Sequence, residues 1–210
     1  KDFGMYILTG ADGFIGKHFK KSLDGVVEVE IDKCFDFFDN FKSWDKIDMI
    51  IHQGALSSTT NKNLEMVYKY NIDYSIKLFE KAIEYGIPVK YASSASVYGN
   101  SAGSINPLNY YAISKVQVDY WVQDNIDKFK SIQGFRFFNV YGPGEEMKGD
   151  QRSPISKFTE QAKMTGKIKV FEESKKMSRD FVCVNDVVDV VSNANNSSGL
   201  YDHGSGNSLD

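Results

Sequence analysis

Tyr111 and Lys115 form the pair of side chains with the clearest potential for chemistry. They stand four residues apart in Tyr-Ala-Ile-Ser-Lys, so both lie on one face of a helix. An ammonium beside a phenol stabilises the phenolate and lowers the phenol pKa from about 10 toward neutrality. Such a tyrosine exchanges a proton with a substrate hydroxyl while hydride moves to or from a nicotinamide. Because the spacing alone is common, the alternative is a solvated pair on a helix surface.

Two serines stand where a third group for this chemistry is expected. Ser93 and Ser94 follow a predicted strand at residues 89–92, and a hydroxyl at this strand end could hold the same oxygen as Tyr111. The pair of Tyr111 and Lys115 becomes more specific when a serine-bearing strand end and a phosphate site precede it.

A glycine-rich turn follows the first predicted strand, at residues 6–8. Gly10, Gly13 and Gly16 come at three-residue steps, and an apolar helical pattern starts between the last two. Backbone N–H groups and the positive end of a helix bind anions at such a turn. Gly10 allows the tight turn, Gly13 the close approach of a pyrophosphate, and Gly16 close packing of helix on strand. The position of the turn after a strand favours a dinucleotide site over an ordinary turn.

The ends of the next two predicted strands, at residues 26–31 and 49–51, add candidate ligands. Asp32 lies about 20 positions after the glycine turn, where an acidic side chain holds a ribose hydroxyl. The adjacent Lys33 favours a 2′-phosphate instead, so NAD and NADP both stay open, as does an ordinary loop pair. Gln53, Gly54 and Ala55 follow the third strand, where small residues let a flat ring approach. Hydroxyl side chains at residues 57–60 fit the same site or a helix cap.

The order of elements predicts the fold class. Helical periodicity covers residues 64–85, with Asn71 inside it, and a further predicted strand lies at residues 132–138. Alternating strands and helices predict an α/β, Rossmann-type doubly wound parallel sheet. Shorter elements follow a Gly/Pro-rich loop at residues 139–149: helices at 154–165 and from 186, and strands at 168–171, 179–182 and 200–203. We therefore predict a dinucleotide-binding domain over residues 1–138 and an interleaved substrate-binding region over residues 139–210.

Composition limits the other classes of function. The 210 residues carry a net charge of −3 without a basic stripe, which argues against nucleic acid. No apolar run approaches the ~20 residues that span a bilayer, and no signal-peptide pattern precedes the first strand. Cys34 and Cys183 make no disulfide framework, so we expect a cytoplasmic protein. His18, His52 and His203 lack metal-ligand spacing, and we predict no metal site.

Four stretches of the chain together resemble the extended short-chain dehydrogenase/reductase family, which includes nucleotide-sugar epimerases and dehydratases. They are TGADGFIG at residues 9–16, SSASVYG at 93–99, YAISK at 111–115 and FRFFNVYGP at 135–143. Within the family the chain looks most like the branch that inverts C6 of an ADP-linked heptose. The stretches that carry this likeness are HQGALSSTT at 52–60, YASSA at 91–95, KG at 148–149, and FE at 171–172 before RDFV at 179–182.

That resemblance implies a reaction and a set of site residues. Bound NADP, with NAD as the alternative, takes hydride from C6, and hydride returns to the opposite face of a 6-keto intermediate. Two faces need two acid/base groups, and these positions match Tyr111 and Lys148, with Ser94 and Lys115 assisting. The matching cofactor positions are Gly10, Gly13, Phe14, Ile15, Asp32, Lys33, Gln53, Gly54, Ala55, Ser57, Asn71, Lys115, Val140 and Lys148. The matching substrate positions are Ser94, Asn139, Asp150, Lys157, Phe171, Glu172, Ser174 and Arg179.

The resemblance also implies a homo-oligomer, a pentamer, and marks where this chain departs from the family. Family members are longer, so we expect the substrate-binding region to be truncated here, with abridged loops after Lys33 and Ser101. A related 4-epimerase and a non-catalytic dinucleotide sensor remain alternatives, although a sensor would be expected to lack Tyr111. A dehydratase is disfavoured because Ser94-Ala95-Ser96 replaces the Thr-Asp-Glu that water loss requires.

Overall fold

The structure is a computed structural model of the chain and describes residues 4–169, 179–206 and 208–209. Its centre is a six-stranded sheet in the order β2-β1-β3-β4-β5-β8, in which every neighbouring pair is parallel. This arrangement confirms the predicted Rossmann-type parallel sheet. The strands are β1 (Tyr6–Thr9), β2 (Val26–Val29), β3 (Met49–His52), β4 (Val89–Ser94), β5 (Ile132–Phe137) and β8 (Gly199–His203).

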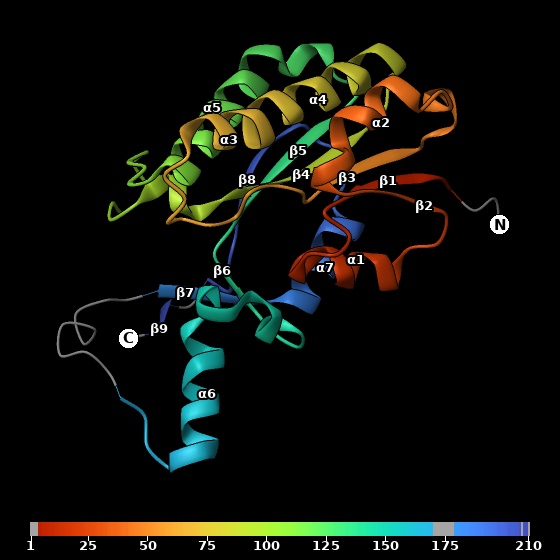
Figure 1. The fold of residues 1–210 in the computed structure, drawn as a ribbon. Coiled ribbons are helices and arrows are strands. Elements are labelled where there is room, and N and C mark those ends of the chain that lie inside the picture. Colours follow the sequence, from red (N-terminus) through yellow and green to blue (C-terminus); the bar gives the residue numbers. More distant parts are fainter. Residues whose placement is uncertain (1–3, 170–178, 207, 210) are drawn as a thin grey trace.

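Helices cover both faces of this sheet (Figure 1). One face carries α2 (Cys34–Asn40), α3 (Leu64–Val67), α4 (Tyr74–Tyr85) and α5 (Tyr110–Asn125), and the other carries α1 (Phe14–Ser22) and α7 (Val184–Asn193). Short 3-10 turns link several elements: η1 (Ile31–Lys33), η2 (Trp44–Lys46), η4 (Ala95–Tyr98), η5 (Ile126–Lys128) and η6 (Glu145–Gln151).

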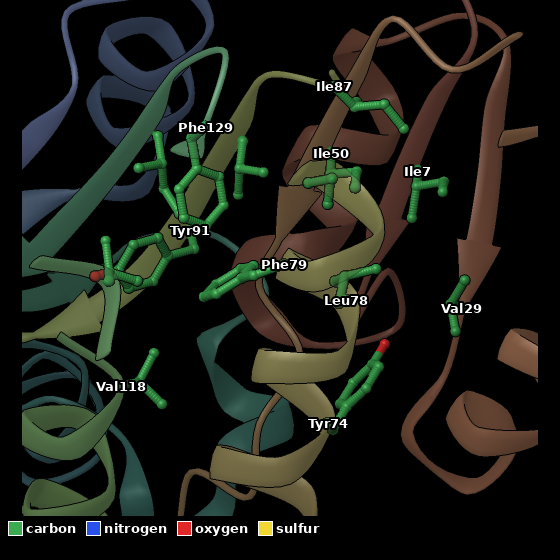
Figure 2. Packing of buried hydrophobic residues seen from close by; sticks show 14 of the residues in the cluster. Ile7, Val29, Ile50, Tyr74, Leu78, Phe79, Ile87, Tyr91, Val118 and Phe129 are labelled. Carbon is green, nitrogen blue, oxygen red and sulfur yellow. The ribbon is translucent and has the colours of Figure 1, made fainter. Parts of the chain in front are cut away.

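Alternation of side chains along the strands builds one hydrophobic core on each face. Successive strand residues point to opposite faces, so Ile7 belongs to the core under α4 and α5, whereas Leu8 belongs to the core under α1 and α7. Figure 2 shows part of the first core, in which Ile50 from β3 and Phe79 from α4 pack beside Tyr91 from β4. The cores fix the strand ends that carry the candidate site.

The helix predicted over residues 64–85 is interrupted by a wider turn. Between α3 and α4 lies a π-helix, η3 (Tyr68–Asp73), which contains the buried Asn71. Single π-turns of this kind occur often at functional sites. Gly86 then ends α4 in the left-handed conformation, with φ of 63°, as expected for a glycine after a helix.

The second part of the chain builds a small sheet and then returns to the large one. Strands β6 (Asn139–Tyr141), β7 (Arg179–Cys183) and β9 (Ser208–Leu209) form the small sheet. Helix α6 (Pro154–Thr165) extends away from the large sheet, and none of its residues is buried (Figure 1). Helix α7 and strand β8 then complete the large sheet and its second face, so the two parts of the chain are interleaved.

Some local predictions are wrong. Residues 31–33 form the turn η1 instead of the end of β2, and an unpredicted helix α2 follows, in which Phe37 and Phe38 pack on Trp44. Ile168 is not in a strand, while residues 170–171 of that predicted strand lie outside the described residues. In the described part of the chain, no helix is long and apolar enough to cross a membrane.

Candidate active site

The candidate site lies at the carboxyl edge of the large sheet, where the strand order reverses. From β1 the chain first moves outward to β2 and later crosses to β3 on the other side of β1. Ligands of open α/β sheets bind in the crevice that such a reversal leaves beyond the carboxyl ends of the strands. The glycine turn after β1 and Gln53 after β3 flank this point.

The glycine turn is held so closely that side chains are excluded from it. Gly10 has φ of 67°, and a Cβ on Gly16 would lie 1.8 Å from the carbonyl oxygen of Gly10. Helix α1 begins directly after Gly13, with no side-chain cap on its first N–H groups. A helix start of this kind suits the pyrophosphate of a dinucleotide.

Gln53 offers a buried amide at the same edge. Neither its Nε2 nor its Oε1 has a hydrogen-bond partner among the described residues, although a buried polar group normally has one. Beside it, the N–H of Gly54 donates to Thr9 Oγ1 at 2.9 Å, and a Cβ on Gly54 would lie 3.0 Å from that oxygen. A polar group without a partner next to a backbone that leaves no room for a side chain fits the binding of a nicotinamide dinucleotide here.

Tyr111 lies in the first turn of α5, which Asn109 caps by accepting the N–H of Ala112 at 2.8 Å. The Tyr111 hydroxyl makes a hydrogen bond with the side chain of Ser94 at the end of β4. Ser93 instead donates to Asp119 at 2.8 Å, so Ser94 is the serine that holds the tyrosine oxygen. Burial raises the pKa of Tyr111, and the hydrogen bond from Ser94 opposes that shift only in part.

Lys115 shares the helix face with Tyr111, but its ammonium bonds elsewhere. Nζ donates to the carbonyl oxygen of Ala92 at 2.8 Å and lies 5.6 Å from the centre of the Tyr111 ring. The side chain is 8% exposed, and burial lowers the pKa of Lys115 to about 8, against the opposing charge of Asp119. The expected acidification of Tyr111 by this ammonium is therefore wrong for the described arrangement: burial raises the Tyr111 pKa, and the Ser94 hydroxyl, not the ammonium, opposes that rise.

Lys148 lies in η6, against the start of helix α1. Its Nζ is 5.0 Å from the centre of the Phe14 ring, and burial lowers the pKa of the lysine while Glu145 raises it. Glu145 is itself buried and accepts a hydrogen bond from Ser153 Oγ at 2.9 Å. Among the described residues no hydrogen bond joins Lys148 to Tyr111. The lysine thus lies on the glycine-turn side of the site, where a second base or a phosphate contact are both consistent with its place.

Asn71 holds a loop at the edge of the site. Its Oδ1 accepts the N–H of Leu56 at 2.7 Å, and its Nδ2 donates to the Leu56 carbonyl and to Ser114 Oγ, each at 3.1 Å. Ser114 in turn donates to the Tyr111 carbonyl at 2.6 Å. Asn71 therefore links the loop after β3 to the first turn of α5. The helix after that loop is capped by Asn63, and not by the hydroxyl run at residues 57–60.

Glu30 is a candidate residue that the sequence reasoning missed. It directly follows β2, and its Oε1 accepts the N–H of Asp12 in the glycine turn at 3.1 Å. The carboxylates of Asp12, Glu28 and Glu30 lie within 4.8 Å of one another, whereas Asp32 and Lys33 are exposed in η1. An acidic residue directly after the second strand could have indicated Glu30. It was missed because the strand was predicted to continue through residue 31.

The remaining predicted positions lie mainly in the second part of the chain. Asn139 Nδ2 donates to the Asp180 carbonyl at 2.9 Å and so joins β6 to β7, and Lys157 Nζ donates to the Asp150 carbonyl at 2.7 Å. Val140 is buried in the core, and Ile15, Ala55 and Ser57 lie near the carboxyl edge with partial or full exposure. Arg179 begins β7, while Phe171, Glu172 and Ser174 lie outside the described residues.

A family model, the NAD dependent epimerase/dehydratase family, matches residues 6–198. The chain belongs to this family. Membership in the NAD dependent epimerase/dehydratase family agrees with the glycine turn and the unpartnered Gln53 amide, and a nicotinamide dinucleotide is the cofactor.

Individual relatives in the family carry more specific names. A protein of Brachyspira hyodysenteriae (strain ATCC 49526 / WA1) named ADP-L-glycero-D-manno-heptose-6-epimerase is 32% identical over 97% of this chain and 76% of its own length. The crystal structure of the Helicobacter pylori enzyme of the same name matches with a TM-score of 0.82 and 30% identity, over 98% of this chain and 78% of that chain. A UDP-N-acetylglucosamine 4-epimerase of Methanobrevibacter ruminantium M1 matches with a TM-score of 0.82 at 22% identity, over 100% and 79% of the two chains, which shows the shared fold.

Proposed function

We propose that this chain is an epimerase that converts ADP-D-glycero-D-manno-heptose to ADP-L-glycero-D-manno-heptose, a precursor of the lipopolysaccharide core. Relatives at 30% and 32% identity bear the name of this enzyme. The observation that carries the proposal is the hydrogen bond between Tyr111 and Ser94, at the sheet edge where the nicotinamide dinucleotide of this family belongs.

The described side chains suggest how the reaction is divided. The cofactor, when bound, takes up a hydride from the sugar and gives it back. Tyr111 exchanges the proton of the C6 hydroxyl on one face, with its oxygen positioned by Ser94. Lys148 serves the opposite face, and burial, which lowers its pKa, makes this lysine a better proton acceptor than an exposed one. Hydride return to the other face inverts C6.

For binding, the proposal keeps the positions that the family resemblance implies. Gly10, Gly13 and Phe14 meet the pyrophosphate side of the cofactor, and Gln53 supplies its unpartnered amide. Arg179, with a guanidinium suited to bidentate bonding, would hold the substrate diphosphate. Glu30 supports NAD as the cofactor rather than NADP, because three neighbouring carboxylates repel a 2′-phosphate.

The cellular setting is part of the same proposal. By resemblance we propose a cytoplasmic homo-oligomer, a pentamer, that acts on a nucleotide sugar and not on nucleic acid or membranes. Light scattering coupled to gel filtration would give the number of subunits. A monomer that turns over substrate would contradict the oligomer and leave the proposed reaction intact.

The test is direct incubation with ADP-D-glycero-D-manno-heptose, with the configuration at C6 read by NMR. We expect conversion by the wild type, and loss of conversion in Tyr111→Phe and Lys148→Met while both variants still bind cofactor. Exposed Lys17→Met serves as the matched control for Lys148→Met. Unchanged sugar in the presence of bound cofactor would exclude the proposal, and epimerisation of a UDP-hexose instead would favour the 4-epimerase. If Lys148→Met kept wild-type turnover, Lys148 would not be the second base.

A further inference from the structure

Helix α5 contacts strand β4 through three side chains on one helix face. Tyr111 bonds to the Ser94 side chain, Lys115 to the Ala92 carbonyl, and Asp119 to Ser93 Oγ at 2.8 Å. Residues spaced by four lie above one another on a helix, so three turns of α5 are attached to residues 91–94 of β4. The first two contacts involve residues of the proposed reaction, and the third involves a residue that the sequence reasoning passed over.

Asp119 is a buried acidic side chain near the site, and both of its carboxylate oxygens are bonded. It is 2% exposed. One carboxylate oxygen accepts from Tyr91 Oη at 2.8 Å, and the other accepts from Ser93 Oγ at 2.8 Å and from Arg136 Nε at 3.1 Å. The carboxylate thereby binds β4 twice and β5 once. A buried charge with this many partners is costly to disturb, so the position of α5 on the sheet depends on it.

Charged and titratable groups from β4, β5 and α5 itself surround Asp119. Strand β5 supplies Arg136, whose Nη1 also donates to Tyr98 Oη at 2.8 Å, and Tyr98 donates to Asp202 of β8 at 2.7 Å. Strand β4 supplies the Tyr91 and Ser93 hydroxyls, and α5 itself supplies Lys115 one turn away. Lys115 faces Tyr111 and the buried, uncharged His52 as well. Asp119 is therefore the negative charge that acts on Lys115.

We propose that Asp119 is a positioning residue for the proposed epimerisation: it fixes α5 on β4 so that Tyr111 meets Ser94, and it keeps Lys115 charged inside the protein. The expected effect of Asp119 on kcat rests on the proposed function, whereas its expected effect on the pKa of Lys115 does not. Burial lowers the pKa of Lys115 to about 8, and the charge of Asp119 raises it. Removal of that charge should let Lys115 lose its proton at a lower pH.

The first test is the titration of Lys115 followed by NMR in lysine-labelled protein, with the resonance assigned by Lys115→Arg. In Asp119→Asn, which keeps the size and an acceptor oxygen, we expect the titration midpoint to fall by about one pH unit. Asp119→Glu keeps the charge and should stay near the wild-type midpoint. Asp124→Asn is the matched control, because Asp124 lies on the same helix and is exposed. This experiment needs no substrate, so it stands even if the proposed sugar is wrong.

The second test is kinetic. In Asp119→Asn we expect kcat to fall about 10-fold, with KM within about 3-fold of the wild type, and the alkaline limb of the kcat profile to move to lower pH. In Asp119→Glu the alkaline limb of the kcat–pH profile should return to its wild-type position, because the charge is kept. The value of kcat should stay below that of the wild type, because the longer side chain displaces the carboxylate. A Lys115 titration in Asp119→Asn that coincides with the wild type, in a variant with a wild-type circular dichroism spectrum, would overturn the proposal. If Asp119→Asn does not fold, Ser93→Ala tests the positioning role alone, because it removes one contact of Asp119 and leaves its charge. We expect a lower kcat, with the alkaline limb of the kcat–pH profile unchanged. A wild-type kcat in Ser93→Ala would overturn the positioning role.

Discussion

Lys115 and Glu30 show how single side chains set the chemistry of this site. The ammonium of Lys115 is almost fully buried and gives its hydrogen bond to a backbone carbonyl. The energetic cost of holding a charge away from water then acts on both members of the pair: it lowers the pKa of Lys115 and raises that of Tyr111. Proton exchange by Tyr111 therefore depends on the hydroxyl of Ser94 and on charges nearby, and not on spacing alone.

Glu30 leads to a prediction about the choice of cofactor. In wild-type protein we expect NAD(H) to bind more tightly than NADP(H), because the carboxylates of Asp12, Glu28 and Glu30 converge beside the glycine turn. Glu30→Ala should weaken NADH binding and strengthen NADPH binding, each by about 10-fold, as about 1.4 kcal/mol is gained or lost. Fluorescence titration with NADH and NADPH measures both.

The control for this prediction is Asp32→Ala, in the exposed turn that the sequence pointed to. We expect it to leave both affinities within about 2-fold of the wild type, since surface charges in water interact weakly. Equal effects of the two substitutions, or tighter binding of NADPH than NADH by the wild type, would show that Glu30 does not select the cofactor.

At the scale of elements, His52 joins three parts of the Rossmann sheet and its helices. Its ring bonds to Thr9 Oγ1 of β1 at 2.6 Å and to Ser75 Oγ of α4 at 2.8 Å, while the residue itself ends β3. Burial lowers the pKa of His52 to about 3. The imidazole is therefore neutral in the folded protein over the whole range in which an unfolded histidine takes up a proton.

This difference makes stability depend on pH. Below about pH 6.5 the unfolded chain binds a proton at His52 that the folded chain does not bind, so the free energy of unfolding should fall by up to about 1.4 kcal/mol per pH unit between about pH 6.5 and 3. In His52→Asn that contribution is absent. Urea unfolding at pH 7.5, 6.0 and 4.5 should show the wild type losing its advantage over the variant as pH falls. A His52→Asn stability curve that runs parallel to that of the wild type across these pH values would contradict this prediction.

Much of the element order could be predicted from the sequence, and the exceptions have physical causes. The glycine turn, the placing of Tyr111 and Lys115 on one helix face, and the helix end at Gly86 depend only on residues close together in the sequence, so the sequence predicts them. The π-turn around Asn71, the helix α2 and the place of Glu30 depend on tertiary packing, such as the contacts that Phe37 and Phe38 of α2 make with Trp44. The hydrogen-bond partners of Asp119 come from two strands, β4 and β5, so no spacing within α5 predicts them.

At the scale of the whole molecule, Lys90 attaches the second part of the chain to the first. This side chain is 2% exposed in the middle of β4, and its Nζ donates to the carbonyls of Val191 at 2.7 Å and Ala194 at 2.9 Å. These carbonyls lie at the carboxyl end of α7, where a helix has acceptors without backbone partners. The ammonium therefore holds α7 on the face that it shares with α1.

We expect Lys90→Met to lower the free energy of unfolding by about 2–3 kcal/mol, because two buried carbonyls lose a charged donor. The loss should be concentrated in α7 and β8, which hydrogen exchange followed by mass spectrometry would reveal as faster exchange over residues 184–203. Lys17→Met, at an exposed lysine of α1, is the control. Uniformly faster exchange over the whole chain would mean that Lys90 supports the general core and not the attachment of α7.

Strand β8 also has a consequence for synthesis on the ribosome. Its neighbour β5 ends at Phe137, yet β8 begins only at Gly199. The N–H and C=O groups of β5 that bond to β8 therefore lack their partners while the segment between the two strands is synthesised. At roughly 5–20 residues per second this interval lasts about 3–12 s. Throughout it the nascent protein exposes an open strand edge, which is a template for pairing with other chains. Ribosomes paused between these two strands should therefore carry the species of this protein most prone to aggregation.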